Sequence, residues 1–94
     1  MRENLLTNET ADGDSEIVTW EGGGAVFDLS GTLDTATVTI SIDVGAGYNF
    51  NSTEMVLSAL GVYSFPYIPT GALVKGTVAT AGGTTDLTLI IISL

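Results

Sequence analysis

The chain has 94 residues and a formal net charge of −9, with 45% hydrophobic and only 14% charged residues. Its two basic residues are too few to replace the counterions of a nucleic acid or to bind an anionic membrane, so the composition argues against both partners. Cysteine and histidine are absent, which excludes disulfides, thiolate metal sites and the most common general base. Ordinary soluble domains are roughly 25% charged, so this weakly charged surface favours an obligate assembly.

Residues 1–16 differ in composition from the rest of the chain. They contain five acidic residues, and Leu5 and Leu6 are their main apolar side chains after Met1. Segments this polar gain too little from burial to fold alone. We therefore expect an acidic N-terminal arm over residues 1–16 and a folded domain over residues 17–94. The sequence shows neither the apolar region of a signal peptide at its start nor the roughly 18-residue apolar run of a membrane span.

Short strands separated by turn signals fill the domain. Residues 17–20 predict a first strand, and residues 21–24, which end in three glycines, predict a turn or bulge after it. Residues 25–30 predict a second strand with Phe27 and Leu29 on one face. A connection of hairpin length leads from there into the next strand.

Residues 35–44 (TATVTISIDV) carry the clearest pattern in the sequence. Apolar and polar residues alternate strictly, which is typical of a strand with one buried and one solvated face. The apolar face carries Val38, Ile40, Ile42 and Val44. The polar face carries Thr37, Thr39, Ser41 and Asp43. A glycine turn over residues 45–47 and a short extended segment over residues 48–51 are expected to follow.

The second half of the domain continues in the same way. Residues 55–60 predict either a strand or a single helical turn, and residues 62–68 predict a strand that Pro66 confines to a sheet edge or ends. Residues 72–80 and 86–94 predict two further strands joined by a glycine hairpin. The spacing predicts an all-β fold, a small antiparallel β-sandwich or jelly-roll-like barrel of about six to seven strands.

The last predicted strand is apolar on both faces. In a two-layer sandwich only one face of a strand meets the core, so the second face needs a cover. We therefore expect an interface with a partner. Its expected members are Leu5, Leu6, Ile90, Ile92 and Leu94. The alternatives are that the N-terminal arm folds back over the strand, or that the strand is central and covered by residues 55–60.

The sequence offers little chemistry for catalysis. A Ser-His-Asp or Cys-His arrangement is impossible, because the chain has neither histidine nor cysteine. A Ser-Lys pair would have to use Lys75, the only lysine, which is instead expected to be a lone cation beside a carboxylate. Asp28, Asp34 and Asp43 are candidates for a carboxylate pair, and the alternative is that each lies at a strand end or on a solvated face. Residues 12–16 (DGDSE) lack the ligand spacing of an EF-hand. We expect no enzymatic activity, no metal and no cofactor.

Four aromatic residues are candidates for a contact surface. These are Trp20, Tyr48, Tyr63 and Tyr67. Exposed aromatic rings on a β-sandwich are a common way to stack against sugars, so a carbohydrate-binding module is one interpretation. Packing in the core or at an interface is the other.

The order of turns and strands resembles small virion proteins of tailed bacteriophages, of the head decoration or capsid cement type. The resemblance spans most of residues 16–94. Two of its motifs lie in the first half of the domain: a strand that ends in Trp and glycines (residues 19–24, TWEGGG), and a Gly-Thr step (residues 31–32) before an alternating strand (residues 36–40). Two lie in the second half: a Gly-x-Tyr-x-Phe strand (residues 61–65) followed by Pro-x-Gly (residues 69–71), and a closing glycine hairpin (residues 82–87, GGTTDL).

This resemblance implies a β-sandwich that is often trimeric and lies on the outer capsid shell, where it bridges neighbouring capsid subunits. The implied partners are the major capsid protein and further copies of the chain, with the protein made in the host cytoplasm and located in the virion. The alternatives are a tail, knob or fibre-associated virion protein and the carbohydrate-binding module.

Overall fold

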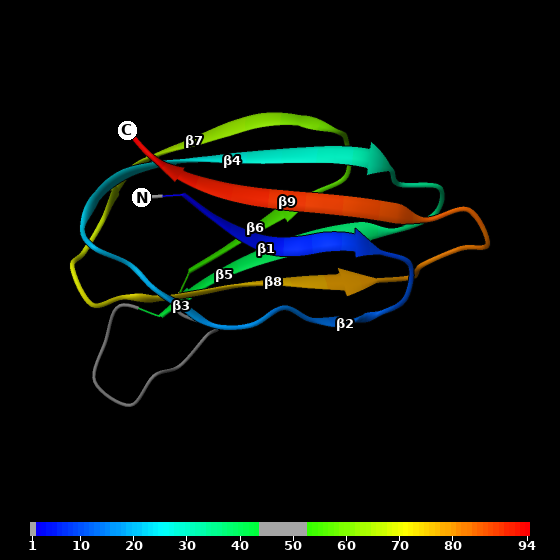
Figure 1. Ribbon diagram of the computed structural model, residues 1–94, viewed down its shortest axis with the longest axis horizontal. Helices are drawn as coiled ribbons and strands as arrows, with labels where there is room; N and C mark the ends of the chain where they lie inside the picture. Colours follow the sequence, from blue (N-terminus) through cyan, green and yellow to red (C-terminus); the bar gives the residue numbers. More distant parts are fainter. Residues whose placement is uncertain (1, 44–52) are drawn as a thin grey trace.

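The computed structural model describes residues 2–43 and 53–94, and every regular element in them is a strand (Figure 1). Within these residues, seven strands have five residues or more: β1 (Arg2–Glu9), β4 (Gly23–Thr32), β5 (Thr37–Asp43), β6 (Thr53–Leu57), β7 (Gly61–Ile68), β8 (Leu73–Ala79) and β9 (Asp86–Ser93). Two further strands have two residues each, β2 (Gly13–Asp14) and β3 (Val18–Thr19). No helix in the described part of the chain is long and apolar enough to cross a membrane.

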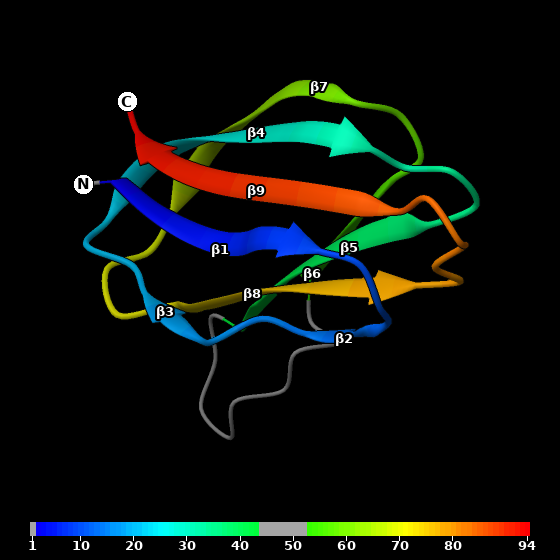
Figure 2. The ribbon, with the colours of Figure 1, turned by 45° about the vertical axis from the view of Figure 1, so that its right-hand side comes forward.

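The strands form two sheets that pack face to face (Figures 1 and 2). One sheet has the order β1-β9-β4-β7, and the other has the order β2-β8-β5-β6, with β3 also paired to β8. All of these pairs are antiparallel. The predicted fold class, a small antiparallel all-β sandwich, is therefore confirmed.

The N-terminal segment differs from the expected arm, because β1 is the edge strand of the first sheet. Leu5 and Leu6 are both buried, at 6% and 2% exposure. Two consecutive residues of a regular strand would point to opposite faces, but the pairing of β1 with β9 shifts by one residue between Asn4 and Leu6. This bulge lets both leucines face the core. The chain then crosses to the second sheet through β2 and β3 (Figure 2).

The core lies between the sheets and is built by the predicted alternation. In β5, Val38, Ile40 and Ile42 are at most 1% exposed, as predicted. On the opposite face the prediction of a solvated surface is wrong at Ser41 and Asp43, which are 5% and 1% exposed. Their partners on β8 are Lys75 and Leu73, whose long side chains stand beside them on the same face. Val44 and residues 45–51 lie outside the described residues.

A bulge in β7 changes the direction of its last side chains. Ala25 pairs with Phe65 but Gly23 pairs with Ile68, so β7 has one more residue than β4 across this step. Ile68 therefore faces the core with no exposed area, whereas Tyr67, the residue before it, is 61% exposed. Pro66 lies in this step, and β7 is an edge strand, as its proline predicts.

The structure decides two questions that the sequence left open, the conformation of residues 55–60 and the cover of the last strand. Residues 53–57 form β6, so the strand prediction for the segment at residues 55–60 is confirmed over a helical turn. β9 is central, between β1 and β4, but β6 belongs to the other sheet and does not cover its outer face.

Candidate functional site

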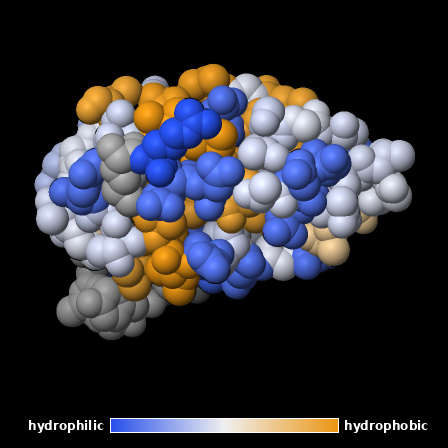
Figure 3. All heavy atoms as spheres, viewed as in Figure 1, coloured by the Kyte–Doolittle hydropathy of each residue, from blue (hydrophilic) through white to orange (hydrophobic). Residues whose placement is uncertain are grey.

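The outer face of the four-stranded sheet carries a row of apolar side chains. Phe27 and Ile91 point into the core with no exposed area, so their chain neighbours point outward. The register places Val26 beside Ile92, and it places Ile90 and Val62 on either side of Asp28. Figure 3 shows hydrophobic side chains gathered along the upper edge of the molecule, over β7 and β4 and beside the C-terminus.

The C-terminal residue completes this row. The backbone N–H of Leu94 donates to the carbonyl oxygen of Gly24 at 3.1 Å. A Cβ atom on Gly24 would lie 2.7 Å from Leu94 Cδ1, so the glycine leaves the space that the leucine side chain occupies. We call the resulting surface the outer patch. It consists of Val26, Val62, Ile90, Ile92 and Leu94.

Exposure varies across the outer patch. Leu94 and Val62 are 78% and 68% exposed, whereas the three residues between them are half-buried. Polar residues border the patch on β1, where Arg2 lies opposite Ile92 and Asn4 lies opposite Ile90. Asp28 also lies on this face, between Ile90 and Val62, so the patch is an apolar surface interrupted by one carboxylate.

The structure places the predicted interface residues in two different environments. Ile90, Ile92 and Leu94 lie together on the outer patch. Leu5 and Leu6 lie in the core of the same chain and offer almost no surface to a partner. Val26 and Val62 were not predicted, because their place on the patch depends on which strands pair and in which register.

The aromatic residues do not form a common surface in the described part of the chain. Trp20 is only 1% exposed, and its indole N–H donates to the carbonyl oxygen of Gly23 at 3.0 Å. The ring of Tyr63 packs against the core and its hydroxyl donates to the carbonyl oxygen of Ala59. Tyr67 is exposed, and Tyr48 lies outside the described residues. A platform that includes Trp20 is therefore excluded by its burial.

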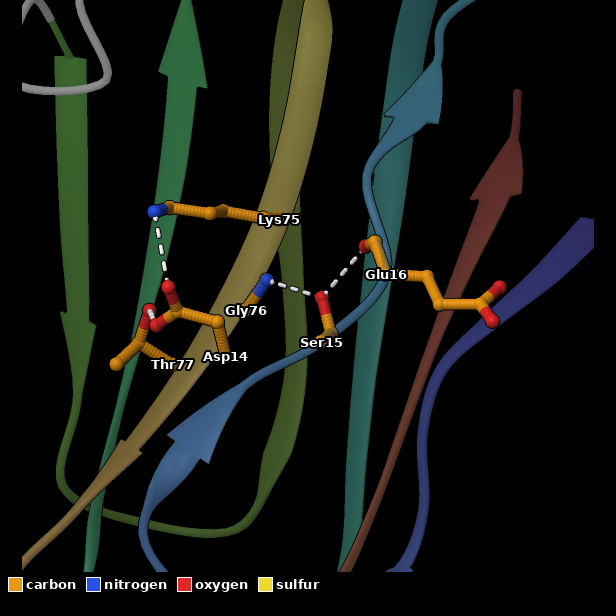
Figure 4. A network of polar contacts seen from close by, with 6 residues as sticks. All are labelled: Asp14, Ser15, Glu16, Lys75, Gly76 and Thr77. Carbon is orange, nitrogen blue, oxygen red and sulfur yellow. Dashed lines mark hydrogen bonds and ion pairs between the residues drawn. The ribbon is translucent and has the colours of Figure 1, made fainter.

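The acidic segment that follows β1 is used for internal contacts (Figure 4). Asp14 lies 3.2 Å from Lys75 Nζ and accepts a hydrogen bond from Thr77 Oγ1 at 2.8 Å. The Ser15 hydroxyl accepts from the Gly76 N–H at 2.8 Å. These contacts attach the segment to β8, and the expectation of Lys75 beside a carboxylate is confirmed.

No group of three or more acidic residues is arranged to hold a metal ion among the described residues. Asp12, the first residue of the acidic motif, accepts a hydrogen bond from the Ala81 N–H at 2.7 Å. The three other candidate carboxylates are also far from one another in the fold. Asp28 lies on the outer face of the first sheet, Asp34 precedes β5, and Asp43 ends that strand in the second sheet.

Asp14 gives the acidic segment a testable pH dependence. The hydrogen bonds from Thr77 and then Lys75 lower the pKa of Asp14 below its usual range. A lowered folded-state pKa adds stability above the unfolded pKa, and this contribution is lost as pH falls through the folded pKa. We expect Asp14→Asn to destabilise the chain at neutral pH by less than about 1 kcal/mol, because the pair is exposed.

Urea unfolding at several pH values measures this effect. The difference between Asp14→Asn and the unaltered chain should shrink toward zero as the pH falls below the usual pKa of an aspartate. Glu16→Gln is the matched control, because its carboxylate points away from the cluster (Figure 4). A deficit of Asp14→Asn that stays constant with pH would contradict the role of the ionised carboxylate.

Comparison with known proteins identified no relatives: no protein-family model, no curated protein and no solved structure matches this chain. The fold and its surface define a small antiparallel β-sandwich with an apolar outer face.

Proposed function

We propose that this chain is a structural virion protein of the head decoration type. It binds the outer capsid shell and stabilises the shell by bridging neighbouring capsid subunits. The observation that carries this proposal is the outer patch, a largely apolar surface on the outer face of the four-stranded sheet that no other part of the described chain covers. The sequence resemblance to phage decoration proteins supports the identity of the partner, the major capsid protein.

The mechanism is adhesion by burial. Covering apolar surface is favourable by about 25 cal/mol per Å², so a shell protein that covers the outer patch gains free energy without any chemical step. The central position of β9, between β1 and β4, gives the patch a rigid base. A rigid surface loses little conformational entropy on binding.

Asp28 adds specificity to this surface. It is half-buried on the outer face, between Ile90 on one side and Val62 on the other. A partner that covers the patch must supply a hydrogen-bond donor to this carboxylate, because a buried charge without a partner is strongly unfavourable. The proposed capsid surface therefore combines apolar side chains with an arginine or a backbone N–H at this point.

The carbohydrate-binding alternative loses its main residue, because the buried Trp20 cannot stack against a sugar. The tail or fibre-associated alternative predicts the same kind of surface but fewer copies in each particle.

Binding to shells that lack the chain tests this proposal. The purified protein is mixed with empty capsids assembled from the corresponding major capsid protein, and the bound fraction is measured by sedimentation. We expect Ile92→Lys to weaken binding about tenfold or more, since each factor of ten corresponds to about 1.4 kcal/mol. The matched control is Val56→Lys, which replaces a 62% exposed apolar residue of the other sheet and should leave binding unchanged.

Each outcome of this experiment is informative. Failure of the unaltered chain to bind the shell would overturn the proposed function. Normal binding by a folded Ile92→Lys variant would overturn the role of the outer patch while leaving the function in place.

A further inference from the structure

The edge strands of the two sheets differ sharply in charge. β1, the first edge of the four-stranded sheet, contains Arg2, Glu3 and Glu9, and β6, an edge of the other sheet, contains Glu54. β7, the second edge of the four-stranded sheet, contains no charged residue, and neither does any position from residue 55 to residue 74. Among the described edge strands of five residues or more, β7 alone has no charge.

An edge strand presents unpaired backbone N–H and C=O groups, which attract another strand unless charge, proline or a bulge blocks it. In β7 the bulge and Pro66 affect only the C-terminal end. The segment Gly61–Phe65 pairs with β4 residue by residue, from Leu29 opposite Gly61 to Ala25 opposite Phe65. Among the described residues, no strand pairs with the outer side of this regular five-residue segment.

Exposed apolar side chains concentrate at the same edge. Val62 and Tyr67 on β7 are 68% and 61% exposed, and Leu60, directly before the strand, is 45% exposed. They make up half of the six large hydrophobic residues that are exposed in the described chain. A strand that pairs with β7 would cover part of this area.

Charge also determines which partner can approach. Six of the 11 acidic residues lie within residues 2–21, the part of the chain that contains β1, β2 and β3. The sheet order places β1 at the opposite edge from β7 (Figure 1). Two copies with a net charge of −9 each repel, and this repulsion is weakest when the uncharged edges meet and the acidic edges point away.

We propose that β7 pairs antiparallel with β7 of a second copy of this chain. Two identical edges that meet about a two-fold axis form a closed, self-complementary contact. With the axis at Tyr63, the centre of the regular segment, Gly61 lies opposite Phe65 of the second copy and Val62 lies opposite Ser64. The pairing ends before Pro66, which has no N–H to donate.

The geometry of this pairing has a functional consequence. Antiparallel pairing in one sheet requires a two-fold axis perpendicular to the sheet, so the two four-stranded sheets form one continuous sheet with both outer patches on the same side. A shell protein would then meet two patches at once, which increases the avidity of binding. This consequence rests on the proposed function, whereas the pairing itself does not.

Light scattering of the purified full-length chain tests the pairing without any shell. We expect a mass of twice the 9.7 kDa of one chain, and a folded monomer for Ser64→Lys, which places a charge in the middle of the open edge. Thr7→Lys is the matched control, because it adds the same charge to the other edge strand and should remain a dimer. A monomeric unaltered chain, the trimer that the sequence resemblance implies, or a dimeric Ser64→Lys would each overturn the proposal.

Disulfide formation gives a second readout that does not depend on how well Ser64→Lys folds. The chain has no cysteine, so single cysteines report only the pairs that they are placed to detect. Opposite residues of antiparallel strands lie about 4.5–5.5 Å apart between Cα atoms, within the range that a disulfide spans. We expect a mixture of Val62→Cys and Ser64→Cys chains to crosslink into the mixed dimer under mild oxidation. Equal crosslinking of Val62→Cys with Thr7→Cys would contradict the proposed register.

Discussion

Leu6→Ala is expected to lower the free energy of unfolding by about 2–5 kcal/mol, the usual cost of truncating a buried leucine. Leu6 is only 2% exposed, although it is the sixth residue of the sequence. Its side chain reaches the region above Gly76 on β8, so it connects the edge of one sheet to the middle of the other. Urea unfolding followed by circular dichroism measures this loss.

The control for Leu6→Ala is Thr7→Ala, the next residue on β1. Thr7 is exposed, and the hydrogen bond that its hydroxyl accepts from Asn4 is open to solvent. We expect this variant to change the free energy of unfolding by no more than about 0.5 kcal/mol. An equally small effect of Leu6→Ala would mean that the N-terminal segment is an arm outside the sandwich.

Gly31→Ala is expected to destabilise the chain by about 2 kcal/mol or more. Gly31 has a φ of +108°, a conformation that residues with a side chain rarely adopt. An added Cβ atom would lie 2.0 Å from the carbonyl oxygen of Asp86, which is backbone and cannot move without disturbing the pairing of β4 with β9. Both strain and steric overlap therefore act at this position. Thermal and urea unfolding measure the effect.

The control for Gly31→Ala is Gly83→Ala, in the hairpin that precedes β9. A Cβ atom at Gly83 would meet nothing within 4 Å, and its φ is not in the left-handed region. The same substitution should therefore change the stability very little, or raise it slightly by restricting the unfolded chain. Similar losses for the two variants would contradict the close approach of β4 and β9 at Gly31.

Local patterns in the sequence predict the strands of the core well. The alternation in residues 35–44 identifies β5 and its buried face, and Phe27 and Leu29 share the core face of β4 as expected. The same reasoning did not identify β1. Two adjacent leucines break a period of two, and they become core residues only because a bulge against β9 turns both inward.

The outer patch could be predicted only in part. Ile90, Ile92 and Leu94 are recognisable because β9 is apolar on both faces, a property that belongs to its own sequence. Val26 and Val62 join them through the pairing of β4 with β9 and β7, and no local pattern reveals such long-range contacts. The local sequence also does not decide whether Trp20 is buried, because its ring is as suited to an exposed stacking surface as to a core.

The uncharged edge of β7 can be recognised only when the sequence and the sheet order are considered together. The absence of charge from residue 55 to residue 74 is visible in the sequence, but its meaning depends on β7 being at the edge of a sheet. In a central strand the same composition would only indicate burial. At an edge it identifies a surface on which another strand can pair.

Quantitative mass spectrometry of intact, purified particles assembled from the genome that carries this sequence tests the proposed function most directly. The chain is counted against the major capsid protein of the same particles. A decoration protein that bridges capsid subunits should occur in numbers comparable to those of the major capsid protein. Absence from the particles would contradict a virion role, and a copy number far below that of the shell would contradict decoration in favour of a tail or fibre component.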